Sequence, residues 1–369
     1  MTMDLTSKSE LFQLIEELKQ DNVIKPHRYF LKVLKSSFTG EEFLDWAKQK
    51  KNIDDKKALD IGEGLLKHQV IKPHKAQGAT TFNPTLLYIL VEDDESDALN
   101  AGNVSEDVQT TTANQVSEQM RKSILKLYGR FLSEDGRSVD YEGMKKSEDF
   151  KAYVNLTKVL KIVDIQTSSR EEKLAFFINV YNALVIHANI VRGPPNNMWK
   201  RYKFFNNTKY IISGKTFSLQ DIENGVLRAN RKGVGQFLLP FGKDDPRLTM
   251  ALDRHEPLIH FALVCGAKSC PPIKMYTAQN IYKELQMAVR AFLDGDDGCE
   301  VDVKSHTIHL SSIFKWYRED FGKNKEELVE FVASHMAEGQ KLKDLKAVME
   351  TKNFKISFLK YDWSLNSKA

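Results

Sequence analysis

The chain has no apolar run of the length that a signal peptide or a membrane span requires. It begins with MTMDLTSKSELFQLIEELKQ, and no later stretch approaches the roughly 20 apolar residues that cross a bilayer. Only three cysteines occur in 369 residues, none of them in a CxxC pair: Cys265, Cys270 and Cys299. Such thiols are typical of a reducing compartment. We therefore expect a soluble, cytoplasmic protein, with peripheral attachment to membranes left open.

Lysine and arginine are missing between Lys75 and Arg121, although the whole chain carries a net charge of +4. The segment from Glu92 to Glu118 contains eight acidic residues and nearly lacks large apolar side chains. Burial therefore cannot offset the entropy that this segment would lose on ordering. The sequence predicts a flexible acidic linker at 92–114, between a domain at 1–91 and a larger domain at 115–369.

The first domain has the pattern of a winged helix. Apolar residues at helical spacing predict helices near 11–18, 43–47 and 58–66, the second of them preceded by the capping-box pair Thr39 and Glu42. Short strands that would form the β-wing are expected at 69–71 and 81–90.

The motifs SSFTGEEFLDWAKQK, KKALDIGEGLLKHQVIKPH and TFNPTLLYIL resemble the DEP domain over roughly residues 8–91. The resemblance implies docking to an anionic membrane surface or a signalling protein. Basic side chains near an anionic leaflet contribute about 1 kcal/mol each. The residues expected to form such a patch are Lys25, Arg28, Lys32 and Lys35. The alternative is a solvated basic face with no ligand.

The larger domain is predicted to be α+β. Its clearest helical pattern is REEKLAFFINVYNALVIHANI, where apolar side chains share one stripe. A hairpin is expected around Ser213-Gly214-Lys215, and the apolar run Ile259–Val264 is typical of a buried strand. Further helices are expected near 116–131, 150–160, 278–293 and 326–337, and further strands near 307–310 and 355–359.

The segment HEPLIHFALVCGAKSCPP combines a histidine, a glycine turn and a thiol. If the chain folds back at Gly266, the sulfur of Cys270 could approach the imidazole of His260, which would take its proton as in thiol catalysis. The two prolines after Cys270 argue against activation, because they remove backbone donors and disfavour a helix there. The alternative is a buried structural histidine beside a rigid Cys-Pro corner. The residues that could orient the ring are Asn179, Asn182, Asp320 and Asp362.

A metal site is the other chemistry to consider, because His260, Cys265 and Cys270 recur at intervals of five residues. On a strand, His260 and Cys265 would point to opposite faces. Structural zinc sites also favour paired ligands two to four residues apart, and no such pair occurs in this segment. We expect neither a metal nor another cofactor.

Several motifs of the larger domain occur together: LAFFINVYNALVIHA, GKTFSLQDIENGVLR, DPRLTMALDRHEPLIHFALVCGAKSCPPI, FKWYREDFG and ISFLKYDWSLN. Over about residues 115–366 the chain resembles domain-of-unknown-function family 547, which is similar to a distant branch of the papain and transglutaminase superfamily. The resemblance implies a triad with His260 as base and with Asn179 or Asn182 on the adjacent helix. That helix lacks the cysteine with which the superfamily begins it. Either Cys270 is the nucleophile in a rearranged order, or the domain only binds.

Two functions therefore remain open. The first is a thiol hydrolase or acyltransferase acting on a peptide or a small amide or ester, targeted by the DEP-like domain. The second is a non-catalytic signalling scaffold that binds an anionic membrane or a receptor-associated partner. We do not expect nucleic acid as a partner, because the stretch most like a recognition helix, Asp54–His68, has as many acidic as basic residues when His68 is counted.

Overall fold

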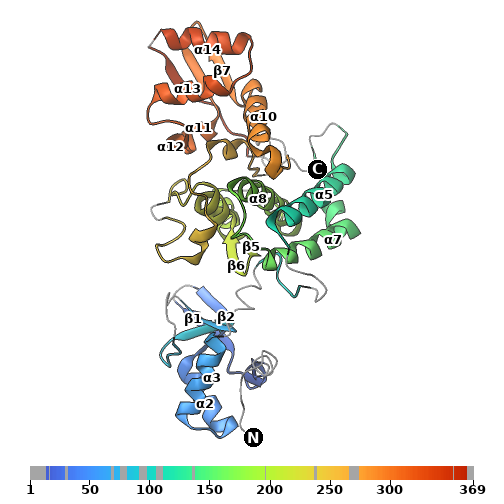
Figure 1. Cartoon of the computed structure of the whole chain (residues 1–369), viewed down its shortest axis with the longest axis vertical. Helices are drawn as coiled ribbons and strands as arrows, with labels where there is room; N and C mark the ends of the chain where they lie inside the picture. The colour runs from blue at the N-terminus through green and yellow to red at the C-terminus, as the bar shows by residue number, and fades with distance from the viewer. Residues whose placement is uncertain are drawn as a thin grey trace. The chain divides into compact units, whose positions relative to one another are not determined.

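The computed structural model describes residues 14–15, 17–29, 32–67, 70–74, 81–90, 98–104, 111–134, 138–195, 197–236, 239–265, 274–351 and 353–363. The chain divides into two compact units, residues 1–98 and 99–369 (Figure 1).

The first unit contains a four-stranded antiparallel sheet with strand order β1-β2-β4-β3. Two helices, α2 and α3, pack against it (Figure 1). The bounds of these elements are Lys25–Tyr29 (β1), Lys32–Thr39 (β2), Gly40–Lys51 (α2), Asp55–Lys67 (α3), Ile71–Pro73 (β3) and Leu87–Leu90 (β4).

Local signals in the sequence explain how the first unit begins its helices and its wing. Thr39 caps α2 by accepting from the backbone N–H of Glu42 at 3.1 Å, while the Glu42 carboxylate accepts from the Thr39 N–H at 2.8 Å. The predicted wing is confirmed as the antiparallel pair β3 and β4. The β1–β2 hairpin was not predicted, and it contains the four residues of the expected basic patch.

The second unit is mixed helix and sheet, as predicted, and its helices are the larger part. Its helical elements are Ala113–Phe131 (α5), Tyr141–Lys146 (α6), Glu148–Thr157 (α7), Lys158–Ile162 (η1), Arg170–Arg192 (α8), Met198–Asn207 (α9), Asp221–Leu227 (η2), Pro246–Met250 (η3), Pro257–Phe261 (η4), Ala278–Asn280 (η5), Ile281–Asp294 (α10), Ser312–Trp316 (α11), Arg318–Phe321 (α12), Lys325–His335 (α13) and Gln340–Glu350 (α14). Its strands are Lys209–Ile212 (β5), Lys215–Ser218 (β6), Cys299–Asp302 (β7), Thr307–Leu310 (β8) and Lys355–Phe358 (β9).

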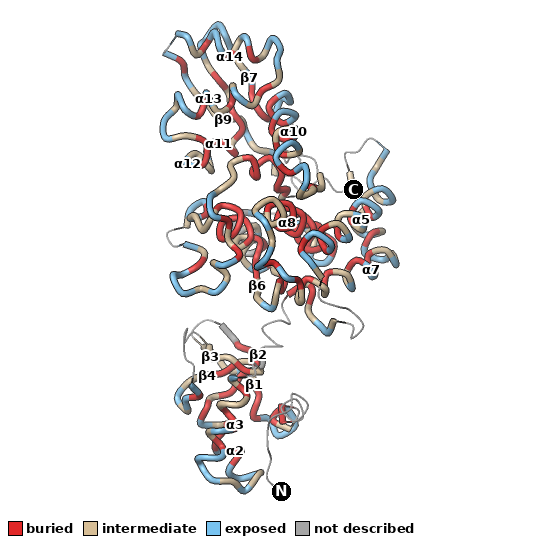
Figure 2. The backbone as a smooth tube through the Cα atoms, in the orientation of Figure 1, coloured by how far each residue is buried: buried red, intermediate tan, exposed pale blue. Residues whose placement is uncertain are grey.

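Helix α8 is the centre of the second unit. Ser169 and Glu172 form a capping box at its start, and every residue from Leu174 to Ile190 is buried, as Figure 2 shows. The helix is long and apolar enough to cross a membrane, but 94% of its most apolar window is buried inside this unit. Its composition is therefore explained by packing on all sides in a protein core.

Two small sheets accompany the helices. Strands β5 and β6 form the predicted hairpin, whose turn residues Ser213 and Gly214 have φ angles of 49° and 69°. Strands β7, β8 and β9 form a three-stranded sheet in which β8 and β9 are parallel.

The predicted buried strand at Ile259–Val264 is wrong in its type. Residues 257–261 form the short 3-10 helix η4, with Pro257 at its start and the Glu256 side chain accepting from the Leu258 N–H. A short apolar run fits a strand and a buried helical turn equally well, so hydrophobicity alone could not decide. The prediction that His260 and Cys265 point to opposite faces of a strand is therefore wrong, because His260 lies in a helical turn.

Part of the predicted acidic linker belongs to the second unit. Asn100 is fully buried, and its side-chain amide donates to the backbone carbonyls of Thr157 and Ile211 at 3.0 and 2.9 Å. Thr112 begins α5 with a capping box. The buried amide of Asn100, together with Leu99 packed against the core of this unit, therefore orders this short segment.

A buried histidine on α8 gives the second unit a pH-dependent stability. His187 Nδ1 lies 2.8 Å from the Tyr210 hydroxyl, and burial, assisted by the charge of Arg192, lowers the pKa of His187 from 6.5 to about 3. His187 therefore binds a proton near pH 6.5 in the unfolded chain but only near pH 3 in the folded chain. This contribution to stability is present above about pH 6.5 and is lost as the pH falls.

We expect His187→Gln to reduce the slope of unfolding free energy against pH by about 1.4 kcal/mol per pH unit between roughly pH 6 and 4. Urea unfolding of the full chain at several pH values measures the slope. The matched control is His306→Gln at an exposed position, which should leave it unchanged. Equal slopes for wild type and His187→Gln would contradict the assignment.

Candidate functional site

A cavity of about 510 Å³ lies in the second unit. Aromatic side chains form much of its wall, together with a few polar groups, which is the usual make-up of a small-molecule or peptide pocket. The residues that line it come from α8, α9, η2, η4, α11, the residues that adjoin these helices, and the C-terminal segment: Tyr181, Arg201, Phe205, Gln220, Glu223, Val234, His260, Leu263, Val264, Cys265, Ile313, Trp316, Tyr317, Tyr361 and Trp363.

The carboxylate of Glu223 is held on the cavity wall by two tyrosines. Tyr181 donates its hydroxyl to Glu223 Oε2 at 3.1 Å, and Tyr317 donates to Oε1 at 2.5 Å. Burial, reinforced by the charge of Glu223, raises the pKa of both tyrosines well above 10. Both phenols therefore remain protonated donors at neutral pH.

The backbone that positions Glu223 is irregular. Residues 221–227 form the π-helix η2, a geometry that often occurs at functional sites. Gly225 is required there, because a Cβ at this position would lie 2.3 Å from the Phe241 ring. The chain then leaves the helix through Ala229 and Asn230, both left-handed with φ near 55°.

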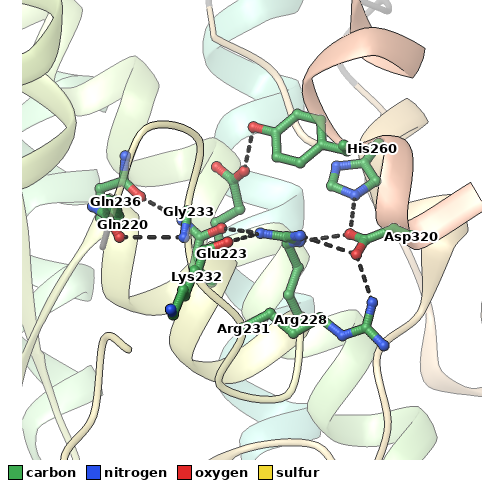
Figure 3. Close-up of polar contacts among 11 residues, drawn as sticks. Gln220, Glu223, Arg228, Arg231, Lys232, Gly233, Gln236, His260 and Asp320 are labelled. Carbon is green, nitrogen blue, oxygen red and sulfur yellow. Dashed lines mark hydrogen bonds and ion pairs between the residues drawn. The ribbon is translucent and has the colours of Figure 1, made fainter. Parts of the chain in front are cut away.

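This turn brings two arginines onto one buried carboxylate (Figure 3). Arg228 contacts Asp320 with both Nε and Nη2, at 2.6 and 2.9 Å, and Arg231 Nη1 lies 2.8 Å from the second oxygen. The paired arrangement of Arg228 is the planar geometry that guanidinium and carboxylate prefer. Arg228 also lies over the Tyr317 ring, 5.1 Å from its centroid.

His260 completes the cluster. Its Nε2 lies 2.8 Å from Asp320 Oδ2, and its ring stacks on Tyr317 with centroids 3.9 Å apart. Burial lowers the pKa of His260, and the hydrogen bond to Asp320 opposes this shift without cancelling it. At neutral pH the ring is therefore uncharged, with Nε2–H donating to Asp320. Nδ1 makes no hydrogen bond within the described part of the chain.

Asp320 itself is almost fully buried, with 1% of its side chain exposed. Burial alone would raise its pKa, but the hydrogen bonds from His260 and Arg228 outweigh that effect and hold the pKa well below its usual range. Of the four residues considered as partners of the His260 ring, Asp320 is the one that accepts a hydrogen bond from it within the described structure.

The two asparagines proposed as triad members lie on α8 and bond to backbone. Asn179 donates to the Ser117 hydroxyl and the Tyr276 carbonyl, both at 2.8 Å, and accepts from the Tyr276 N–H. Asn182 donates to the Ala262 carbonyl and accepts from the Val264 N–H, both at 3.0 Å. The bonds of Asn182 fix the chain on either side of Leu263, which lines the cavity.

The thiols are in different situations. Cys270, the predicted nucleophile, lies outside the described residues. Cys265, five residues after His260, lines the cavity, and its sulfur lies 3.4 Å from the Tyr361 hydroxyl. Within the described ranges, no group of three or more His, Cys, Asp or Glu side chains is placed to hold a metal ion.

The expected membrane-binding residues lie on β1 and β2 of the first unit. Lys25 forms an ion pair with Glu42 at 2.7 Å, whereas Arg28 is exposed. The side chains of Lys32 and Lys35 lie outside the described part of the chain. Of the two members whose side chains are described, Arg28 is exposed and Lys25 is paired with Glu42.

Glu223, Arg228 and Tyr181 were not among the predicted site residues. The segment that contains the first two, DIENGVLRANR, carries two acids, two arginines and an Asn-Gly pair in eleven residues. The available signal was this cluster of charges of both signs in a short segment. Because charged residues usually lie on a solvated surface, only the tertiary structure could show that these are buried.

Removing the charge of Asp320 should strongly destabilise the second unit. Asp320→Asn leaves Arg228 buried without its carboxylate, a situation that costs about 3 to 5 kcal/mol. Urea unfolding at pH 7 measures the loss, with Asp296→Asn at an exposed position as control. A loss below about 1 kcal/mol would show that the cluster does not support the fold.

Two families of proteins match this chain. Residues 22–90 match the family described as Domain found in Dishevelled, Egl-10, and Pleckstrin (DEP), and residues 165–293 match Protein of unknown function, DUF547. No curated protein matches the chain. The second match includes Glu223, Arg228, His260 and Cys265 but ends before Tyr317 and Asp320, and it is shorter than the resemblance over 115–366. The chain therefore consists of a DEP domain followed by a larger α+β unit that contains a DUF547 domain.

Proposed function

We propose that the chain is a signalling or docking protein whose DEP domain attaches it to an anionic membrane surface or a signalling protein, and whose second unit binds a peptide or small molecule. The observation that carries the second half of this proposal is the aromatic-lined cavity of about 510 Å³. Its size lies in the range of pockets that bury most of a small ligand.

The first half is supported by the DEP match and by the charge of the β1–β2 hairpin. DEP domains generally mediate interactions with membranes or signalling proteins. Arg28 is exposed, so it can approach an anionic leaflet without breaking a contact. Lys25 forms an ion pair with Glu42, whose pKa is lowered to about 2: burial raises it, but the hydrogen bonds from Lys25, the Thr39 backbone and His27 together outweigh that effect. Attachment of this kind would place a cytoplasmic protein peripherally at a membrane.

We expect Arg28→Gln to weaken binding of the full chain to vesicles of phosphatidylcholine and phosphatidylserine by about 1 kcal/mol, or about fivefold. Vesicle co-sedimentation at several salt concentrations measures this, and binding should fall as salt rises. Lys57→Gln on α3 is the charge-matched control, because Lys57 is exposed and lies outside the hairpin. Equal losses for both variants, or binding insensitive to salt, would argue against docking through the hairpin.

Thiol-dependent acyl transfer or hydrolysis is a second candidate, and one contact favours it. His260 is oriented by Asp320 through Nε2, and it lines the same cavity as Cys265. In this reaction the thiol of Cys265 or Cys270 would give its proton to His260 and attack an amide or ester carbonyl. His260 would then protonate the leaving group, and water or an acceptor would release the acyl group. Asp320 would hold the ring in the tautomer that this requires.

The reactivity of each thiol tests this candidate. We expect alkylation of the catalytic thiol by iodoacetamide at pH 6.5 to fall at least tenfold in His260→Gln, because the imidazole no longer takes the thiol proton. Mass spectrometry after limited labelling reads Cys265 and Cys270 separately, and buried Cys299 serves as the internal reference. Unchanged alkylation rates at both thiols would rule out thiol catalysis through His260. That result would not count against the proposed ligand binding.

A further inference from the structure

The two charged groups on the wall of the cavity lie in different surroundings. Glu223 contacts Tyr181 and Tyr317. It lies beside the cluster of Arg228, His260 and Asp320 (Figure 3). Arg201 lies over the Trp363 ring, 3.8 Å from its centroid, and Trp363 packs against Tyr361 and Trp316. One part of the wall is therefore acidic and another part is basic.

The carboxylate of Glu223 can accept more hydrogen bonds than it receives from the described residues. The contacts of Glu223 in the described structure are the two tyrosine hydroxyls, one to each oxygen, whereas a carboxylate can accept about four hydrogen bonds. Arg228 and Arg231, the nearby cations, contact Asp320. None of the ion pairs among the described residues includes Glu223, although only 8% of the residue is exposed.

The guanidinium of Arg201 likewise has hydrogen-bond donors available to a ligand. Stacking on Trp363 leaves the edge of the Arg201 guanidinium, where its N–H donors lie, available to a ligand. Within the described ranges Arg201 takes part in no ion pair. Burial removes part of the hydration of the guanidinium and thereby lowers its pKa. A partly dehydrated cation in an aromatic wall favours an anionic group that can enter with the ligand.

We propose that the cavity binds a short peptide or amino-acid-like zwitterion, with its amine at Glu223, its carboxylate at Arg201, and its apolar part against the aromatic wall between them. This inference rests on the proposed ligand-binding function of the cavity and names the ligand class. Aromatic side chains beside a carboxylate suit a cationic nitrogen, and a guanidinium suits a carboxylate. A ligand with only one charge would satisfy only one of the two groups.

Four forms of the dipeptide Ala-Phe test the proposal: both ends free, the amine acetylated, the carboxylate amidated, and both ends blocked. Calorimetric titration of the full chain gives four affinities that separate the two ends. We expect the free dipeptide to bind at least tenfold more tightly than the doubly blocked form, with each single block removing part of this gain.

Two variants assign each end to its partner. In Glu223→Gln the free amine should no longer improve binding, while the free carboxylate still does. In Arg201→Gln the reverse should hold. Glu338→Gln, at an exposed position of the same unit, is the control and should keep the wild-type pattern. Thermal unfolding checks that each variant folds, and the comparison of four peptides on wild type needs no variant.

The outcomes separate this inference from the function on which it rests. If the doubly blocked peptide binds as tightly as the free one, the cavity takes ligands but the charge assignment is overturned. If a free end improves binding equally in wild type and in the variant of its assigned partner, that assignment is overturned. If none of the four forms binds at millimolar concentration, both the inference and the proposed ligand binding fail.

Discussion

The buried carboxylate of Asp320 is the contact on which the site of the second unit depends. It receives Arg228, Arg231 and His260, residues that lie 92, 89 and 60 positions away along the chain. A carboxylate in this environment is stable only while its partners surround it, since burial of an unpaired charge costs several kcal/mol. The same contact therefore fixes η2, η4 and α12 relative to one another, and with them the wall of the cavity.

Helix α8 provides the second constraint. Its side chains are buried all around, so it cannot shift without disturbing packing on every face. Asn179 pairs with the backbone of Tyr276, and Asn182 pairs with the backbone of Ala262 and Val264 beside the cavity. These amides satisfy donors and acceptors that would otherwise be buried without partners, which accounts for two polar residues in the centre of an apolar helix.

These constraints bear on both candidate functions in the same way. A ligand pocket gains affinity when its polar groups are already in place, because less ordering accompanies binding. Glu223 is held by two tyrosines that also form the wall, and Tyr317 is stacked on His260. An oriented, neutral imidazole is equally the arrangement that a general base requires. The aromatic and charged wall around it is the additional feature that a purely structural cluster would not need.

Much of the secondary structure follows from the sequence alone. The predicted cap at Thr39, and the apolar periodicity along α5, α8 and α10, depend on neighbours within one or two turns. The same local information failed at Pro257–Phe261, where a short apolar run became a 3-10 helix, and at the β1–β2 hairpin. His260 and Asp320 were visible as candidates because their residue types are chemically distinctive.

The tertiary structure decided which of those candidates meet. Glu223 and Arg228 are positioned by a π-helix, and the two consecutive left-handed residues after it, Ala229 and Asn230, lead to Arg231. Their partners come from segments far apart in the chain. No local pattern encodes such a meeting, because it results from packing of the whole unit around α8. The sequence by itself determined the DEP domain, the α+β class and the chemistry available; folding alone determined that this chemistry lines one cavity.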